Sequence, residues 1–236
     1  MRINIIFEDN HLLVVEKPVN MPTQGDITGD LDLLAFLKKD LKVRYGKPGN
    51  VYLGLVHRLD RPVGGVMVFA KTSKAASRLS AQIREGNFGK NYLAVTHGSL
   101  KNKNGKLHHY LLKDYRRNIV AAVPESTPDA REAWLDYWVI GEQEGMSLLQ
   151  IALGTGRSHQ IRVQFAAIGH PLYGDQKYGS QVNRPGEQLA LFSFKLCLQH
   201  PVSKEYLEFR ATPPRTYPWT IFQRLRDEHT HIGLSL

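Results

Sequence analysis

One acid in the sequence lies between two arginines in a turn-like stretch, where it could do carboxylate chemistry. HRLDRPVGG, residues 57–65, places Asp60 between Arg58 and Arg61. Neighbouring positive charge favours the ionised form of an acid and lowers its pKa. Such an acid suits a nucleophile or an electrostatic stabiliser better than a proton donor. A solvated surface ion pair, worth at most about 1 kcal/mol, explains the same pattern.

A second stretch, GTGRSHQIRVQFAAIGHPLYGDQKYG (154–179), combines glycines with basic side chains. Its pattern predicts a helix that is capped by Ser158 and stopped by Gly169. The apolar stripe of this helix comprises Ile161, Phe165 and Ile168. Its first turn would present backbone N–H groups to an anion such as a phosphate, together with the side chains of Arg157, His159 and Arg162. A solvent-facing basic helix end is the simpler alternative.

Other candidate residues are weaker on their own. Tyr92, in the strand-like run NYLAV, could stack on a nucleobase, although a lone strand aromatic more commonly fills a core. His108 and His109 have no cysteine or carboxylate at ligand spacing, so no metal site is expected. The patterns for a P-loop, a dinucleotide fold and a nucleophile elbow are missing, so nucleotide cofactors and simple serine-hydrolase chemistry lack support.

Strand patterns surround Asp60. Residues 3–8 and 11–17 predict a hairpin. VYLGLVH (51–57) predicts a strand that leads into HRLD, and VMVFAK (66–71) the strand that leaves it. Glycines after the acid allow the chain to turn sharply before that strand. We therefore expect Asp60 at the edge of a sheet.

Two helices are predicted in the same half of the chain. The first spans 31–42 with Asp30 as its N-cap. Its apolar face comprises Leu34, Leu37 and Leu41. The second spans about Ser73 to Glu85 and ends at Gly86. Its inward face comprises Ala76, Leu79 and Ile83.

The rest of the chain is mostly strand. Strands are predicted at 91–98, 109–113, 118–123, 131–140, 147–153, 189–198 and 205–210, before a basic, proline-rich tail at about 212–236. There is neither a repeat nor a clear linker. The expected architecture is a single mixed α+β domain over residues 1–236 with a largely antiparallel sheet.

Composition and charge narrow the setting. The 236 residues are 42% apolar and 22% charged, which is typical of a globular chain with a core. A net charge of +9 favours a polyanionic partner, although it also serves solubility. Cys197 is the sole cysteine, so no intramolecular disulfide forms, and a reducing, cytoplasmic setting is expected. No apolar run approaches the roughly 18 residues of a transmembrane helix, and no signal peptide is expected.

Taken together, these motifs resemble the RluA-type pseudouridine synthases. HRLD at 57–60, K-x-Y at 90–92, GRSHQIRV at 156–163 and GHPLYGDQKYG at 169–179 occur in the order typical of that family. LLVVEKPVNMPTQ (12–24) is also similar. One short motif would be a weak signal, whereas four in order with compatible spacing make a strong one.

The resemblance implies roles for individual residues. Asp60 would be the catalytic aspartate, Arg162 its cationic partner, and Tyr92 the aromatic side chain packed against the target base. Arg58 would fill the base stack when the nucleotide flips out, and Val163 would line the uracil pocket. Further substrate contacts are expected from Lys17, His57, Lys90, Arg157 and His159.

The resemblance also implies an activity and a fold. The reaction isomerises uridine in RNA to pseudouridine, with no metal or organic cofactor. It breaks the N1–C1′ bond and joins C5 to C1′, so it needs a carboxylate near the ribose and a site that excludes water. Whether Asp60 bonds to the sugar or removes a proton from it is open. The family fold is a bent mixed sheet in two halves around a central RNA cleft.

Two departures from the family pattern lie near the motifs. Val63 and Gly64 stand where many members have hydroxyl side chains before the glycine at position 65, and Asn20 stands where glycine is usual. If the hydroxyls only cap the turn, a second glycine replaces them; if they orient Asp60, activity or substrate choice differs. Asparagine also enters left-handed conformations, so Asn20 is tolerable.

The resemblance leaves the substrate open between a transfer RNA and a ribosomal RNA. We expect a monomer without the small S4-like RNA-binding domain of some relatives. Target choice would then come from the 21–30 loop, the KNKNGK turn, the 110–118 hairpin with Arg116 and Arg117, and the basic tail.

Two alternatives differ in class. One is a non-catalytic RNA-binding protein on the same fold. The other is a carboxylate-dependent nucleoside or glycoside hydrolase, which needs a second acid near Asp60. Asp175 is the candidate for that acid, although its place in YGDQKYG favours a loop anchor.

Overall fold

The computed structural model describes residues 2–225, and the chain forms two compact units. Unit 1 comprises Met1–Lys90 and Ser193–Ala211, and unit 2 comprises Asn91–Phe192 and Thr212–Leu236. The last part of the predicted tail, residues 226–236, lies outside the described residues. That the whole chain acts as a single domain stays a prediction.

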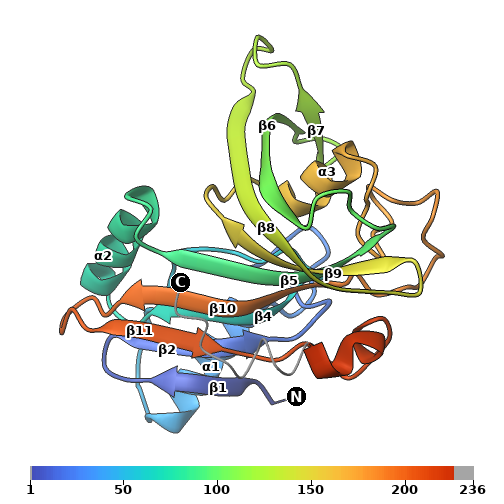
Figure 1. Ribbon diagram of the computed structural model, residues 1–236. Helices are drawn as coiled ribbons and strands as arrows, with labels where there is room; N and C mark the ends of the chain where they lie inside the picture. Colours follow the sequence, from blue (N-terminus) through green and yellow to red (C-terminus); the bar gives the residue numbers. More distant parts are fainter. Residues whose placement is uncertain (1, 226–236) are drawn as a thin grey trace. The chain divides into compact units, whose positions relative to one another are not determined.

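Unit 1 contains a sheet whose strands alternate along the chain with two helices (Figure 1). Its strands are β1 (Asn4–Glu8), β2 (Leu12–Lys17), β3 (Gly54–Leu55), β4 (Gly64–Ala70), β10 (Leu191–Gln199) and β11 (Tyr206–Arg210). The order is β1-β2-β4-β10, with β3 paired to β4 and β11 paired to β10. The β1–β2 hairpin and the strand that leaves HRLD were predicted, and both are confirmed.

The first helix of unit 1 begins two residues later than its pattern predicted. Helix α1 spans Leu33–Arg44, and the side chain of Asp32, not Asp30, caps it by accepting from the Ala35 N–H. The shift places Leu33 on the buried face in place of Leu34, beside Leu37 and Leu41. Asp30 instead forms an ion pair with Arg61.

The second helix of unit 1 turns a polar residue inward. Helix α2 spans Ser73–Arg84 and buries Ala75, Leu79 and Gln82 rather than the predicted Ala76 and Ile83. The amide of Gln82 donates to the Gln199 carbonyl oxygen and accepts from the Gln199 N–H. These two hydrogen bonds offset the free-energy cost of burying the Gln82 amide. A prediction from the apolar residues alone does not place a polar side chain on the buried face.

The strand predicted at 51–57 is only two residues long. It pairs Gly54 with Ala70 and Leu55 with Phe69 and then stops. The next donor on β4, the Val68 N–H, binds Nε2 of His57 at 3.1 Å. Because that donor is occupied by a side chain, the ladder ends and the chain turns into HRLD.

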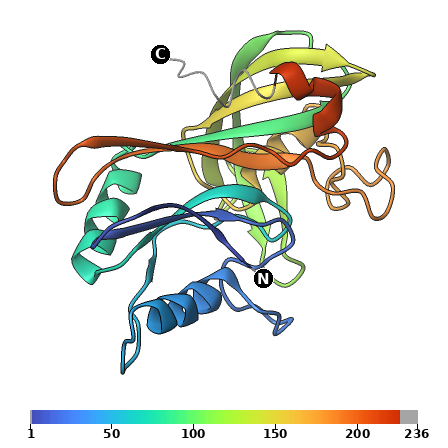
Figure 2. The same ribbon diagram turned by 90° about the horizontal axis from the view of Figure 1, so that it is seen from below.

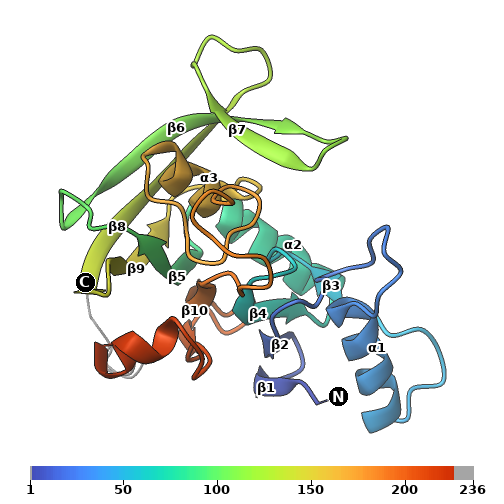
Figure 3. The same cartoon turned by 90° about the vertical axis from the view of Figure 1, so that its right-hand side faces the viewer.

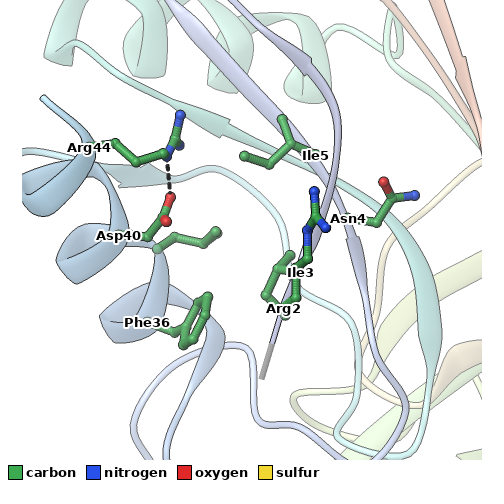
Figure 4. A pocket seen from close by; sticks show the side chains of 8 residues that line it. Arg2, Ile3, Asn4, Ile5, Phe36, Asp40 and Arg44 are labelled. Atoms are coloured by element: carbon green, nitrogen blue, oxygen red, sulfur yellow. Dashed lines mark hydrogen bonds and ion pairs between the residues drawn. The ribbon is translucent and has the colours of Figure 1, made fainter.

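A half-open groove of about 570 Å³ lies between β1 and α1, which run alongside each other (Figure 2). Ile3, Ile5, Phe36 and Leu37 form its apolar part. Arg2 and the ion pair of Arg44 with Asp40 lie beside them (Figure 4). None of the predicted site residues lines this groove.

Unit 2 is built on an antiparallel sheet. Its strands are β5 (Gly89–His97), β6 (Asn104–Asp114), β7 (Ile119–Val123), β8 (Arg131–Gln143) and β9 (Met146–Leu153), ordered β5-β9-β8-β6-β7. Helix α3 (Gln160–Ala167) packs against β6 and β7 (Figure 3). A short 3₁₀ turn, η1 (Trp219–Phe222), lies in the tail.

The expected fold class is confirmed. The strands of the described residues pair antiparallel along β1–β2–β4, β10–β11 and β5–β9–β8–β6–β7, and helices accompany the strands in both units. Among the described residues, no helix is both long and apolar enough to cross a membrane.

Candidate active site

The turn that carries Asp60 is closed by backbone and held from one side by a loop. The Val63 N–H donates to the Asp60 carbonyl oxygen at 2.9 Å. Leu59 is buried, and its carbonyl oxygen accepts from Thr23 Oγ1 at 2.8 Å. Asp60 itself is half-buried, and the preceding Arg58 is exposed. The turn therefore presents its acid and one arginine at the surface while its backbone stays fixed.

Lys17 supports this turn from below. It is fully buried, and Nζ donates to the carbonyl oxygens of Pro18 at 3.0 Å and Arg61 at 3.1 Å. The pKa of Lys17 is lowered to about 7, chiefly by burial. The charge of Asp60 raises this pKa, and the charge of Arg61 lowers it. An ammonium with no exposed surface holds the turn and places positive charge near Asp60, which favours a supporting role for Lys17, and its expected contact with substrate stays a prediction.

Arg61 turns toward the 26–30 loop. Its guanidinium forms an ion pair with Asp30 and donates to Thr28 Oγ1 at 3.1 Å. Asp26 completes the loop by accepting from the N–H and the hydroxyl of Thr28. One of the two arginines that flank Asp60 in sequence thus anchors a neighbouring loop.

The glycines after Asp60 belong to strand β4 rather than to the turn. Gly65 has φ +117°, and a Cβ there would lie 2.1 Å from the Ser193 carbonyl oxygen. Val63 and Gly64 are buried, and the turn closes through the Val63 backbone. The missing hydroxyls are therefore not required to close it. Asn20, at φ 62°, adopts the left-handed conformation expected of it.

His57 is a structural acceptor in unit 1. Its Nε2 accepts from the Val68 N–H, so this nitrogen carries no proton. Burial, together with the charge of Lys90, lowers the pKa of His57 to about 3, and burial also lowers the pKa of Lys90. The ring packs against Phe88 with centroids 5.5 Å apart. These contacts favour a role for His57 in ending β3 over the expected contact with substrate.

In unit 2, the start of α3 differs from its prediction. Ser158 does not cap the helix; His159 occupies the N-cap position at φ 52° without a side-chain cap. Gln160 instead binds the loop that precedes the helix. Its Oε1 accepts from the Arg157 N–H at 3.0 Å and from Thr155 Oγ1 at 2.8 Å. Its Nε2 donates to the Trp134 carbonyl oxygen at 2.9 Å. The glutamine of GRSHQ therefore orders the loop before the helix.

The basic side chains predicted to form an anion site have protein partners. Arg157 is exposed, and its Nε donates to the Glu132 carbonyl oxygen at 2.9 Å. His159 Nδ1 lies 2.6 Å from the Tyr178 hydroxyl oxygen. The helix ends at Ala167, so Ile168 of the predicted stripe is 37% exposed, whereas Ile161 and Phe165 are buried.

Arg162 is buried rather than on a polar helix face. It forms a two-pronged ion pair with Asp175: Nε lies 2.7 Å from Oδ2, and one terminal nitrogen lies 2.8 Å from Oδ1. Sequence reasoning missed this partner, although Asp175 occurs in the same 26-residue stretch. Asp60 belongs to unit 1 and Arg162 to unit 2, so their predicted pairing stays a prediction.

The two apolar candidates of unit 2 are both buried. Tyr92 lies in β5 opposite Ile151 of β9 and is 6% exposed. Val163 belongs to a cluster with Leu111, Val120 and Ala133, against which Tyr178 packs. Burial fits a core role and also fits a pocket wall, so their contact with a base stays a prediction. No cluster of metal-ligating side chains occurs within residues 2–225.

The architecture defines the class of protein. The chain is similar to the solved structure described as human RNA pseudouridylate synthase domain containing 4, with a TM-score of 0.77, 22% identity, and coverage of 96% of this chain and 92% of that one. The likeness extends to human RNA pseudouridylate synthase domain containing 1, with a TM-score of 0.70, 24% identity and 95% coverage of both chains. The fold is that of pseudouridine synthase domains.

Sequence comparison gives the family. The model of the RNA pseudouridylate synthase family matches residues 11–167. An uncharacterised RNA pseudouridine synthase of Aquifex aeolicus is 35% identical, with coverage of 91% of this chain and 71% of the relative. Ribosomal large subunit pseudouridine synthase D of Haemophilus influenzae is 32% identical, with coverage of 90% and 68%. The chain therefore belongs to the RNA pseudouridylate synthase family, and it is an RNA pseudouridine synthase, an isomerase.

Proposed function

We propose that Asp60 is the carboxylate that acts on the ribose of the target uridine. The observation that carries this proposal is its turn: the backbone is closed by Val63, a buried Lys17 ammonium lies beneath, and the acid stays half-exposed. A carboxylate fixed near positive charge is placed for attack on C1′ or for removal of a sugar proton.

The chemistry balances without a cofactor. The N1–C1′ bond breaks, the uracil turns within the site, and C5 bonds to C1′. The hydrogen on C5 then leaves as a proton, and N1 gains one. Both routes for Asp60, a covalent sugar ester or a glycal, use the same ionised carboxylate and return it unchanged.

Other residues take part in this reaction by our proposal. Arg58 is exposed beside Asp60 and can enter a base stack, where it offsets part of the few kcal/mol lost on flipping a nucleotide. Arg162 and Tyr92 act on the same uridine as cation and aromatic partner, and Val163 supplies apolar surface to the uracil. The family motifs support these four assignments.

For the substrate, we propose a uridine in large-subunit ribosomal RNA. The support is the similarity to the Haemophilus influenzae relative, a ribosomal large subunit pseudouridine synthase at 32% identity. Transfer RNA is the second candidate. A pseudouridine map by carbodiimide adducts and primer extension, in a deletion strain complemented with wild-type or Asp60→Ala protein, separates the two.

The test of Asp60 uses RNA transcribed with uridine tritiated at C5. Each turnover releases one tritium to water, and we expect Asp60→Asn to lower this rate at least about 100-fold while RNA affinity stays near wild type. Asn keeps the volume of the side chain and removes the charge. Wild-type turnover in Asp60→Asn would overturn the assignment.

The same assay separates a hydrolase from an isomerase. Chromatography of the digested RNA shows either retained pseudouridine or released free uracil, and we expect retention. Asp175, the acid that a hydrolase would need, is buried, and both of its carboxylate oxygens accept hydrogen bonds from Arg162.

A further inference from the structure

The second half of the long motif, GDQKYG, forms a cradle for an arginine in the first half. Asp175 is 1% exposed and binds both Nε and a terminal nitrogen of Arg162. Two parallel bonds fix the plane of a guanidinium as well as its position. Asp175 binds two of the five N–H donors of Arg162. Because the guanidinium is planar, these two bonds determine the directions of the other three donors.

Asp175 is itself held in place. Its Oδ1 accepts from the backbone N–H groups of Lys177 at 3.0 Å and Tyr178 at 3.1 Å. Asn183 braces the same loop, because its Nδ2 donates to the carbonyl oxygens of Leu172, Asp175 and Gly179. The prediction that Asp175 anchors a loop is confirmed, and the anchored loop is a rigid support for Arg162.

Tyr178 covers one face of the same guanidinium. The Arg162 carbon Cζ lies 5.1 Å from the centre of the Tyr178 ring, a cation–π distance. The Tyr178 hydroxyl accepts from the Val120 N–H at 2.9 Å and contacts His159 Nδ1 at 2.6 Å. These contacts hold the ring against β7 and the start of α3. Asp175 therefore binds the edge of the Arg162 guanidinium, and Tyr178 covers one of its faces.

We propose that Asp175 is a positioning residue for the isomerisation, and that together with Tyr178 it holds the Arg162 guanidinium in the orientation that the reaction uses. The inference rests on the proposed function of Arg162. It explains why the motif continues beyond α3 to GDQKYG. Burial of an ion pair carries a desolvation penalty, and Asn183 already braces the loop without one. Orientation of the Arg162 guanidinium is a role that accounts for this penalty.

The test is Asp175→Asn. The asparagine Oδ1 can still accept from the N–H groups of Lys177 and Tyr178, so the loop keeps its anchor. The new NH₂ group faces the Nε–H of Arg162 and cannot accept from it. We expect kcat for tritium release to fall about 10- to 100-fold, with KM for RNA within about threefold of wild type, because misorientation costs rate rather than backbone contacts.

The matched control is Asn183→Ala, which loosens the same loop without touching Arg162. Both variants are assayed well below their melting temperatures, which circular dichroism supplies. We expect Asn183→Ala to lower Tm at least as much as Asp175→Asn and to reduce kcat far less. If the two variants lose kcat in the same proportion to their loss of Tm, Asp175 only supports the loop and the inference is overturned. A wild-type kcat in Asp175→Asn would overturn it as well.

A cycle with Arg162→Lys isolates the coupling. Lysine cannot form the two-pronged pair, so Asp175→Asn should lower kcat less than about threefold in that background. An undiminished effect there contradicts action through Arg162. Failure of this inference is distinct from failure of the proposed function, because Asp60→Asn abolishes turnover whether or not Asp175 orients Arg162.

Discussion

A lysine without exposed surface supports the turn that carries Asp60. Lys17 donates to the Arg61 carbonyl oxygen in that turn and to the Pro18 carbonyl oxygen at the end of β2, and its charge lies near Asp60. Sequence placed it among substrate contacts because basic residues in an RNA enzyme commonly bind phosphate. Its burial favours a supporting role instead, and burial of a lysine at the end of β2, opposite Gly65 of β4, cannot be deduced from the KP dipeptide alone.

Lys17 makes stability depend on pH in a defined direction. Burial lowers its pKa from 10.5 to about 7 in the folded chain, so between these values the unfolded chain binds more protons. Stability therefore rises with pH across that window. Lys17→Met removes this contribution. In urea titrations we expect the stability of wild type, relative to Lys17→Met, to grow by about 2 kcal/mol from pH 7 to pH 9.

The matched control for this experiment is Lys39→Met, at an exposed position of α1. Its stability relative to wild type should stay constant over the same pH range. A constant difference for Lys17→Met as well would mean that the pKa of Lys17 is not lowered. At every pH, Lys17→Met also removes the donor that binds the Pro18 and Arg61 carbonyl oxygens, hydrogen bonds worth about 1 kcal/mol each.

At the scale of elements, one close backbone approach defines the start of β4. Gly65 lies against the Ser193 carbonyl oxygen of β10, with φ +117°. We expect Gly65→Ala to destabilise the protein by about 3 kcal/mol or more, because strain at positive φ adds to a clash with backbone that cannot move aside. Chemical denaturation measures the loss, and tritium release should fall with it, because Gly65 follows the Asp60 turn.

Gly86→Ala separates the two causes. Gly86 also has positive φ, at +78°, but a Cβ there would meet nothing within 4 Å. It should cost only the conformational strain, about 1 kcal/mol. Similar losses at both positions would show that the contact with β10 is unimportant.

Elements were predictable where local pattern decides them. The β1–β2 and β6–β7 hairpins follow from alternation and turn residues, and the stop of α3 follows from Gly169. Prediction failed where a distant side chain intervenes. His57 ends β3 by taking the Val68 N–H, and Gln82 turns α2 toward β10. Neither partner is near in sequence, so periodicity carries no signal of it.

The residues of the candidate site were also predictable only in part. Asp60 and Arg162 were found because their motifs are short and ordered. The partners that fix them were missed: Lys17 was given a different role, and Asp175 was named only as a loop anchor or a second acid. Side-chain partnership depends on the fold, whereas the residue types needed for chemistry are visible in the sequence.

At the scale of the whole molecule, positive charge should govern affinity for RNA. With a net charge of +9, binding releases counterions from phosphates, so the dissociation constant depends on salt. We expect RNA affinity to fall at least about tenfold between 50 and 200 mM salt, measured by filter binding. Asp60→Asn should follow the same line as wild type, because in our proposal Asp60 acts on the ribose and not on the phosphate backbone.

The tip of the β6–β7 hairpin carries part of this charge. Arg116 and Arg117 are exposed there, and the Asp114 carboxylate accepts from both of their N–H groups, so the turn is fixed. The double variant Arg116→Ala/Arg117→Ala should weaken RNA binding and reduce the salt slope by about 2, one unit for each lost phosphate contact. Lys39→Ala/Lys42→Ala removes the same charge from exposed positions of α1. If both pairs change the slope equally, net charge alone steers the RNA; a larger change for the hairpin pair places phosphate contacts at its tip.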